Sequence, residues 1–484
     1  MNYRMILRYL AGTLLITAGF MIPALVISLV LKESRSAAAF GITIALIFVS
    51  CLPVIARKPK RLGLRAREGY MITALAWFLV SAAGALPFCI SGCIPNYIDA
   101  LFEAASGFST TGASILTELD PLPKGILYWR SFSHWLGGMG VLVFLLALTP
   151  SASSGDSVFI MRAESPGPQV SKLVPRTRQS AQILYKIYVG MTLAEILLLL
   201  LGGMNAFDAV CISFGTAGTG GFAVRSSGMG SYTPYMQWVI TVFMILFGLN
   251  FGIYYLIIMR SFKKIRRNDE VRVYLALVAV SILAITWFIR PLYPEGLEPA
   301  LRNASFQVAS IISTTGFATA DFNLWPTVCK MLLVALMFAG ACAGSTAGGV
   351  KISRLVILFK SLKLSLKKLL HPNTVLKIHV DGDAIPDSTL NFVYFYFGAY
   401  IFVLGFSLLL VSLDGLSFEG TFSAVVACLN NVGPGLAEVG PVSNYSFLSI
   451  PSKIILTLDM LIGRLEIFPV LMLLLPANWK RARS

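Results

Sequence analysis

Four triplets that end in glycine are the residues of this chain whose types and spacing point most clearly to chemistry. They are Thr110-Thr111-Gly112, Thr219-Gly220-Gly221, Thr314-Thr315-Gly316 and Asn431-Val432-Gly433. Backbone carbonyls and threonine hydroxyls are hard oxygen ligands, and a ring of them can replace the water shell of an ion. Because the triplets carry no fixed negative charge, such a ring suits a monovalent cation better than a transition metal. Glycine suits positions where a carbonyl must point inward, because a side chain resists the required backbone dihedrals.

Each triplet glycine follows a polar residue at nearly the same distance. The four offsets are 13, 13, 13 and 14 residues, and we expect the polar residues to be helix N-caps: Asp99, Asp208, Asn303 and Glu419. The intervening dozen residues would make about 18 Å of helix, which reaches the middle of a bilayer without crossing it. Such a half-helix points its negative carbonyl end at the triplet, where it favours a cation.

The repetition predicts one supersecondary unit used four times: helix, re-entrant half-helix, extended loop, helix. Extended backbone at membrane depth is tolerated only where it is buried in protein or lines a water-filled path. The alternative is that the triplets are ordinary Gly/Thr turns with a chance similarity. Four such loops at matched spacing argue against that alternative, so the unit predicts a pore.

Composition decides which elements must hold these loops. The chain is 56% hydrophobic and only 13% charged, yet its net charge is +16. These values exclude a soluble globular enzyme and a disordered basic protein, and they indicate a polytopic membrane protein. Ten windows with few or no charges predict ten spanning helices: 10–31, 37–56, 70–95, 131–150, 187–207, 226–259, 273–289, 331–350, 388–413 and 452–476.

Positive charge predicts the orientation of these spans. Six Lys and Arg residues lie in 57–68, six in 260–272 and seven in 351–377, and these segments are alternate connections. The positive-inside rule therefore predicts a multi-pass protein with both termini in the cytoplasm. No run interleaves Arg with base-stacking aromatic residues, so we expect no nucleic-acid partner.

Few side chains within the windows are suited to catalysis. An intramembrane enzyme would need paired Asp residues, a Ser–His pair or a His/Glu metal cluster. Asp459 has no acidic partner at helical spacing, and His134 lies in an apolar helix without a nearby Ser-containing elbow. The seven cysteines are scattered and form no CxxC pair, which is typical of reduced packing residues. We therefore expect His134 to be a packing residue and the protein not to be an enzyme.

At the four triplets the chain resembles the Trk/Ktr/HKT superfamily of potassium transporters, and over nearly its full length it looks like a Trk-type bacterial potassium-uptake subunit. The resemblance implies an all-α potassium-channel-like pore with one filter glycine per repeat and K⁺ as the transported ion. HKT proteins that prefer sodium carry Ser at the first filter position, where this chain has Gly112. The second and fourth triplets depart from Thr-Thr-Gly, so the expected ring is not fourfold symmetric.

The resemblance also sets the expected domain organisation. An N-terminal transmembrane hairpin would span 1–56, as in the Trk branch, and four pore repeats would span 57–155, 156–262, 263–370 and 371–484. The resemblance further implies a homodimer in the bacterial inner membrane and a cytosolic regulatory subunit that binds nucleotides. The basic loops could dock that subunit, or they could serve only as topology signals and contacts with anionic lipids in the bilayer.

Two further features suggest a gate. Ten consecutive small residues interrupt the second span of the third repeat and include Gly340, Gly344, Gly348 and Gly349. Glycine lowers helix stability, so a non-helical gate segment is expected, although the four-residue spacing also fits a tight helix–helix packing face. The resemblance agrees, because an intramembrane loop in this repeat is regarded as the family's gate.

Arg464 lies within the last apolar window, where a charge is costly. One explanation is a buried ion pair with another helix. The other, which matches an arginine of the family, is an electrostatic barrier to cations below the filter.

The main rival reading is an alternating-access secondary transporter, a K⁺/H⁺ or Na⁺ symporter. That class predicts inverted repeats with broken spanning helices. Here the repeats run in the same orientation, which favours the pore, while coupling of the flux to H⁺ or Na⁺ stays open.

Overall fold

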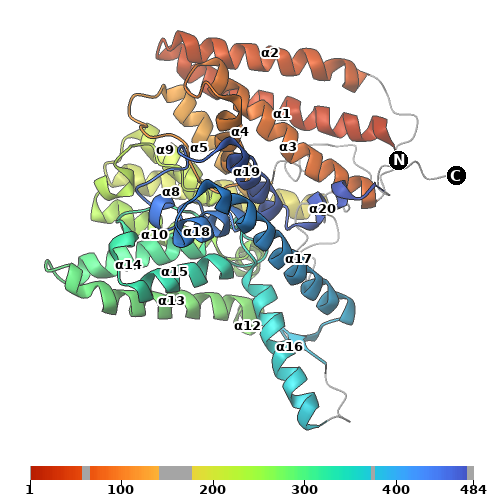
Figure 1. Cartoon of the computed structure of the whole chain (residues 1–484), viewed down its shortest axis with the longest axis vertical. Coiled ribbons are helices and arrows are strands. Elements are labelled where there is room, and N and C mark those ends of the chain that lie inside the picture. Colours follow the sequence, from red (N-terminus) through yellow and green to blue (C-terminus); the bar gives the residue numbers. More distant parts are fainter. Residues whose placement is uncertain (1, 57–65, 141–176, 372–376, 477–484) are drawn as a thin grey trace.

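A computed structural model of the chain describes residues 2–56, 66–140, 177–371 and 377–476. These residues form an almost entirely helical molecule (Figure 1). The first two helices, α1 (Tyr3–Val30) and α2 (Ser34–Ala56), pack against each other as the predicted N-terminal hairpin. The sequence-based boundaries near residues 57, 155 and 371 fall at or next to segments outside the described residues, as do most of the basic residues in 57–68 and 151–179.

The four repeats share one architecture: a long helix, a short buried helix, and a second apolar segment. The long helices are α3 (Ala66–Ile90), α8 (Thr177–Leu201), α13 (Asp269–Ile289) and α17 (Asp387–Val411). The short helices, which we call the pore helices, are α4 (Tyr97–Phe108), α9 (Ala206–Gly218), α14 (Leu297–Ile312) and α18 (Phe418–Leu429). The order of elements within each repeat therefore follows the predicted unit.

The second segments are interrupted or short. They are α5 (Lys124–Gly138), α10 with α11 (Pro234–Phe247 and Phe251–Ile258), α15 with α16 (Thr327–Ala339 and Ile352–Leu370), and α19 with α20 (Ile450–Arg464 and Phe468–Leu474). The pair α10 and α11 meets at 90°. Residues 141–176, which follow α5, lie outside the described part.

The prediction of ten spanning helices is not confirmed by the described residues. Six helices there are long and apolar enough to cross a membrane, or seven if α10 and α11 count as one bent span. The six are α1, α2 and the first helix of each repeat. Backbone breaks explain the difference, because the second segments contain residues that end a helix, such as Gly340 (φ 62°), Glu466 (φ 54°) and Ile467 (φ 71°).

The repeats close into a circle. The second segment of each repeat packs on the pore helix of the next one: α5 on α9, α10 on α14, and α15 on α18. The circle ends where α19, from the fourth repeat, packs on α4 of the first. This arrangement places the four pore helices in the interior and turns their C-terminal ends toward one central region.

Close backbone approach explains why glycines end two of these segments. A Cβ atom on Gly137, at the end of α5, would clash with the carbonyl oxygen of Phe108, the last residue of α4. A Cβ on Gly463, near the end of α19, would clash with the carbonyl of Leu429, the last residue of α18. Small residues at such crossings allow helix backbones to approach closely.

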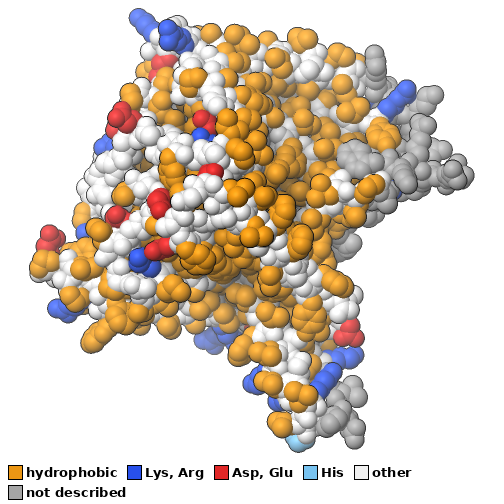
Figure 2. Space-filling view, viewed as in Figure 1, with side chains coloured by type: hydrophobic (Ala, Val, Ile, Leu, Met, Phe, Trp, Pro, Cys, Tyr) orange, Lys and Arg blue, Asp and Glu red, His pale blue; other side chains and the backbone are white. Residues whose placement is uncertain are grey.

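The outer surface is apolar. Large hydrophobic side chains such as Leu283, Trp287 and Phe402 are exposed on the long helices, and Figure 2 shows hydrophobic side chains over most of the visible face. The helix α16 projects from the body of the molecule (Figure 1), with Lys and Arg side chains around it (Figure 2). Such a surface fits a protein surrounded by lipid rather than water.

Several small elements complete the chain. The helix α12 (Phe262–Arg267) carries exposed basic residues, and strands β1 (His379–Val380) and β2 (Asp383–Ala384) form an antiparallel hairpin with His379 opposite Ala384. Five 3₁₀ turns lie in connections: η1 (Gly228–Ser231), η2 (Arg290–Leu292), η3 (Phe322–Leu324), η4 (Ser412–Asp414) and η5 (Ala437–Val439).

Candidate ion pathway

The pore helices begin earlier than the sequence suggested. The N-caps with side-chain bonds are Asn96, Asn205 and Ser417, which accept hydrogen bonds from the backbone N–H groups of Ile98, Phe207 and Gly420. The third pore helix follows Gly296 and has no side-chain cap. The cap assignments of Asp99, Asp208, Asn303 and Glu419 are therefore wrong.

The cause is local chemistry. A short Asn or Ser side chain reaches a backbone N–H two or three residues ahead, which leaves the carboxylates in the first turn. There Asp99, Asp208 and Glu419 complement the positive end of the helix dipole. Asn303 lies deeper within α14, where its side-chain oxygen accepts a hydrogen bond from the Thr319 hydroxyl at 2.8 Å.

The three first-turn carboxylates also form ion pairs. Asp99 pairs with Lys453 of α19 at 2.7 Å, and Glu419 pairs with Lys330 of α15 at 3.1 Å. Both pairs join a pore helix to the second segment of the preceding repeat. Asp208 instead pairs with Arg225 of its own repeat at 2.7 Å. The hydrogen bond that Arg225 donates to the Asp208 carboxylate raises the pKa of Arg225, so this guanidinium stays charged.

The four predicted triplets adopt the same backbone conformation. The first residue of each has a left-handed φ, between 54° and 57°, and each final glycine has φ between 73° and 94°. The residues in the first position are Thr110, Thr219, Thr314 and Asn431. Non-glycine residues rarely adopt such dihedrals, so four occurrences at equivalent positions show that the loops have one common design despite their different sequences.

The four triplets meet in a closed ring. A Cβ on Gly112 would clash with the carbonyl oxygen of Gly220, and a Cβ on Gly221 would clash with that of Thr315. In the same order, Gly316 abuts the carbonyl of Val432, and Gly433 abuts the carbonyl of Thr111. The contacts run from repeat one through repeat four and back to one. The Thr and Asn side chains of the ring are buried and its glycines are at least half-buried, and the ring is rich in oxygen atoms, as a site for a desolvated cation requires.

Polar contacts behind the ring hold it in place. The Asn431 amide donates to the Thr111 hydroxyl at 3.0 Å, and the Tyr445 hydroxyl donates to the Gly433 carbonyl at 2.7 Å. His134 is fully buried; its Nδ1 bonds to the Gly107 carbonyl at 2.8 Å, and its Nε2 accepts from the Phe222 N–H at 3.3 Å. His134 thus has the packing role expected of it.

A buried ion pair joins the first two loops. Arg130 Nε lies 2.6 Å from a carboxylate oxygen of Glu103, a pore-helix residue. Glu103 also accepts from the backbone N–H of Ile115 at 3.0 Å, while Arg130 donates to the carbonyl of Ala223 at 2.8 Å. Because both residues lie at most 3% exposed, removing either partner would leave an uncompensated buried charge. Sequence reasoning did not find this pair.

The interruption predicted in the third repeat is confirmed. Helix α15 ends at Ala339 and α16 begins at Ile352, and residues 340–351, the intramembrane segment, are not helical. Gly340, Gly344 and Gly349 all have positive φ. The alternative of a continuous helical packing face is therefore wrong.

The intramembrane segment lies directly against the ring. The N–H of Gly348 donates to the Thr314 hydroxyl at 2.8 Å. A Cβ on Gly348 would stand only 2.7 Å from the carbonyl oxygen of Asn430, which precedes the fourth triplet. The segment thus contacts loops of repeats three and four at once.

Arg464, the last residue of α19, bridges the intramembrane segment and the first repeat. Its guanidinium donates to the Thr346 carbonyl at 2.6 Å and to the carbonyls of Gly137 and Gly138 at 2.5 and 2.6 Å. Carbonyls at the end of a helix such as α5 have no intrahelical partner, so a cation there is favourable. Glu466, two residues further on, pairs with Arg354.

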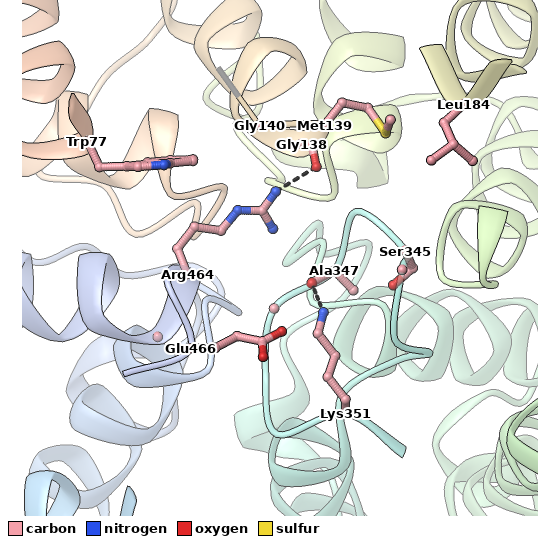
Figure 3. A pocket seen from close by; sticks show the side chains of 13 residues that line it. Trp77, Gly138, Met139, Gly140, Leu184, Ser345, Ala347, Lys351, Arg464 and Glu466 are labelled. Atoms are coloured by element: carbon pink, nitrogen blue, oxygen red, sulfur yellow. Dashed lines mark hydrogen bonds between the residues drawn. The ribbon is translucent and has the colours of Figure 1, made fainter. Parts of the chain in front are cut away.

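A small cavity of about 110 Å³ lies beside these groups. Arg464, Lys351 and Glu466 line it together with Trp77 and glycines of the intramembrane segment. Figure 3 shows the Arg464 and Lys351 side chains entering this space from different elements, Lys351 bonding to the Ala347 carbonyl. Two cationic groups therefore stand next to the ring on the side of the intramembrane segment.

Four discontinuous repeats around a buried ring of backbone oxygens define a class of membrane protein that passes ions. Within the described residues, no group of three His, Cys, Asp or Glu side chains is placed to hold a metal ion.

Comparisons with known proteins support this class. The TrkH family model, described as a cation transport protein, matches residues 34–289 and 294–481. The Trk system potassium uptake protein TrkH of Escherichia coli strain K12 is 37% identical over 490 residues, covering 99% of this chain and 100% of that protein. TrkG of the same strain is 33% identical over 468 residues, covering 95% of each chain. The crystal structure of the potassium transporter TrkH from Vibrio parahaemolyticus matches with a TM-score of 0.87 at 32% identity, over 99% of this chain and 100% of that one.

The chain belongs to the TrkH family of cation transport proteins. It is a membrane transporter rather than an enzyme.

Proposed function

We propose that this protein is the membrane subunit of a potassium-uptake system in a bacterial inner membrane, and that K⁺ passes through the ring. The observation that carries the proposal is the closed contact of four equivalent triplets, from Gly112 to Gly433 and back to Thr111. Relatives named potassium uptake proteins, similar over nearly their whole length, support the choice of ion.

The chemistry of the ring favours a monovalent cation. Its oxygens are backbone carbonyls and hydroxyls, and the carboxylate of Glu103, on the first pore helix, is paired with Arg130. The four pore helices end at the ring, so their negative carbonyl ends add a favourable field for a cation. A desolvated K⁺ would exchange its water oxygens for ring oxygens with little cost.

We propose that the intramembrane segment is the gate and that Arg464 is part of the barrier. The segment donates to the Thr314 hydroxyl, and Arg464 ties it to the end of α5. Opening then requires these bonds to break together. The positive charges of Arg464 and Lys351 repel a cation that enters the cavity while the segment is in this position.

The remaining elements of the proposal concern orientation and partners. Both termini and the basic elements α12 and α16 would face the cytoplasm, following the positive-inside rule. There they would meet a cytosolic nucleotide-binding regulatory subunit, and two copies of the chain would form a homodimer. The name Trk system, carried by the relatives, supports a multi-component assembly.

Flux into liposomes tests this function. Purified full-length protein is reconstituted, and ⁸⁶Rb⁺ uptake is driven by an outward K⁺ gradient, with internal pH recorded at the same time. A pore predicts uptake that needs no Na⁺ and moves no stoichiometric protons. Uptake that requires an imposed H⁺ or Na⁺ gradient would instead support the alternating-access symporter. Because the segment would keep the wild-type pore closed, the same assay is run on protein that lacks residues 342–347, and absence of Rb⁺ uptake in that folded variant would contradict both.

A further inference from the structure

Glu270 of α13 bonds to the backbone at both ends of the intramembrane segment. It is the second residue of α13, and only 7% of the residue is exposed. One of its carboxylate oxygens accepts hydrogen bonds from the N–H of Ala343 at 2.6 Å and from the N–H of Ser353 at 3.1 Å. A single oxygen atom therefore binds two backbone groups from different parts of the third repeat.

The positions of the two donors explain what this contact does. Ala343 lies near the start of the intramembrane segment, and Ser353 lies in the first turn of α16, just after the segment ends. Neither N–H has an intrahelical partner, because one lies outside a helix and the other is among the first four of α16. The carboxylate thus holds the two ends of the intramembrane segment close together.

On either side of Ala343, the backbone of the segment is held by bonds between neutral groups, whereas further along the Thr346 carbonyl accepts from Arg464. The Cys342 N–H donates to the Gly248 carbonyl at 3.1 Å, and the Gly344 carbonyl accepts from the Phe251 N–H at 3.0 Å. Hydrogen bonds to a charged carboxylate are shorter and roughly twice as strong as bonds between neutral groups. Glu270 consequently provides the one charge-assisted side-chain bond described here to a backbone N–H within residues 340–351.

We propose that Glu270 is a positioning residue that latches the intramembrane segment in its closed position against the ring. The proposal deepens the proposed function and rests on it where it concerns flux. The latch itself concerns only the position of the segment, which can be measured separately. Loss of the carboxylate removes two buried bonds at the base of the segment, so the segment leaves the ring more often.

Cys342 reports on the segment without any transport measurement. It is fully buried beside Ala343, and the other six cysteines (Cys51, Cys89, Cys93, Cys211, Cys329 and Cys428) can be replaced by Ala or Ser. In this single-cysteine protein, the rate of reaction with a maleimide measures exposure of the segment. Glu270→Ala is expected to raise that rate by about tenfold, since two hydrogen bonds to a charged group are lost. It is also expected to increase ⁸⁶Rb⁺ flux into liposomes that contain no cytosolic partner.

A matched control is present in the same chain. Glu33 also accepts two backbone hydrogen bonds at the start of a helix, from Lys124 at 2.6 Å and Gly125 at 3.1 Å. Glu33→Ala removes equivalent bonds far along the chain from Cys342 and should change neither the labelling rate nor the flux. Glu270→Asp keeps the charge but shortens the side chain by one methylene. A smaller rise in the labelling rate, about threefold, is expected because the shorter side chain reaches only one of the two donors.

The outcomes separate the latch from the gate. Unchanged Cys342 labelling in folded Glu270→Ala protein overturns the latch, whatever the flux. Faster labelling with unchanged flux supports the latch but contradicts the proposal that the segment is the gate. If Glu270→Ala does not fold, Glu270→Asp decides by the same labelling rate, and no increase there overturns the latch.

Discussion

Arg464 makes the most direct single-residue contact between the intramembrane segment and the rest of the pathway. Its guanidinium bonds to the carbonyls of Thr346, Gly137 and Gly138 and lies 5.9 Å from the centre of the Trp77 ring. The residue thus links repeats one, three and four. The sequence located the charge, whereas its three carbonyl partners could be identified only in the folded chain.

Arg464→Ala is expected to increase K⁺ flux in liposomes without a partner by at least roughly tenfold. The change removes both a bridge to the segment and a positive charge beside the ring, and a charge at about 4 Å costs a passing cation a few kcal/mol at intermediate dielectric. Arg464→Lys keeps the charge with fewer donors and should increase flux less. A folded Arg464→Ala protein that conducts less than wild type would contradict the barrier role.

Residue-level prediction was uneven for physical reasons. The triplets and the small-residue run were found because special backbone dihedrals select Gly, and this selection is visible in sequence. The caps were misplaced by two or three residues in three repeats and by seven in the third. Asn96 with Asp99, and Asn205 with Asp208, form a capping-box-like spacing that could have revealed two of them. The Arg130–Glu103 pair and the bonds of Tyr445 depend on distant loops meeting, which no local pattern encodes.

At the scale of elements, two of the second segments contain breaks that the sequence analysis did not predict: one lies between α10 and α11 and the other between α19 and α20. Composition predicts an apolar segment, but it does not reveal a break of a few residues. The run at 340–349 was long enough to be recognised, whereas Gly248-Leu249-Asn250 and Leu465-Glu466-Ile467 were not. Within an apolar window, a glycine followed by polar residues is the sequence feature that indicates such a break.

Deleting residues 342–347 should produce a constitutive K⁺ leak. The deletion removes Thr346, whose carbonyl bonds to Arg464. It also shortens the stretch of chain that places Gly348 against the ring. The measurement is ⁸⁶Rb⁺ uptake into liposomes by purified protein without a cytosolic partner. If the shortened protein is stable and its flux does not exceed wild type, the segment is a packing element and not a gate.

The start of the fourth pore helix offers a stability test. Ser417 caps α18 and also donates to Glu438 at 2.7 Å. These bonds from Ser417 hold the pKa of Glu438 below its ordinary value of 4.5. Ser417→Ala should lower the free energy of unfolding by about 1 kcal/mol, as loss of a cap usually does.

The pH dependence of that loss follows from the direction of the pKa shift. A carboxyl with a lowered pKa contributes stability above its ordinary pKa, and the contribution disappears as pH falls through the lowered value. The stability difference between wild type and Ser417→Ala should therefore be largest near neutral pH and narrow in acid. Denaturation in detergent at a series of pH values measures it; a difference that grows in acid would contradict the assigned bond.

At the scale of the whole molecule, the start of α13 in the third repeat connects several elements. The Asp269 N–H donates to Asp381 of the β1–β2 hairpin at 2.8 Å, and Lys360 of α16 bonds to the Asp269 carboxylate at 2.5 Å. The next residue, Glu270, holds the intramembrane segment. A partner that moves the hairpin or α16 would thus act close to the proposed latch.

The circular packing of the four repeats is the central structural fact behind the account. Each loop touches the next, so a change in one triplet alters a site shared by all four. The repeat was evident from matched spacing in the sequence, but the order of neighbours around the ring required the structure. This shared site is also what distinguishes a single central pore from four independent turns.

Competitive uptake of Rb⁺ and Na⁺ by Gly112→Ser and Gly316→Ser variants tests this claim most directly. Both glycines have φ near 82°, and any Cβ would meet a neighbouring backbone carbonyl or proline ring. In cells lacking other K⁺ systems, each substitution should reduce Rb⁺ uptake and admit Na⁺, lowering the K⁺/Na⁺ preference by about tenfold or more, equivalent to about 1.4 kcal/mol. Gly398→Ser, a glycine of α17 with no atom near its Cβ position, should leave the ratio unchanged. An unchanged ratio in both ring variants, with the proteins folded and present in the membrane, would contradict the assignment of the ring as the selectivity filter.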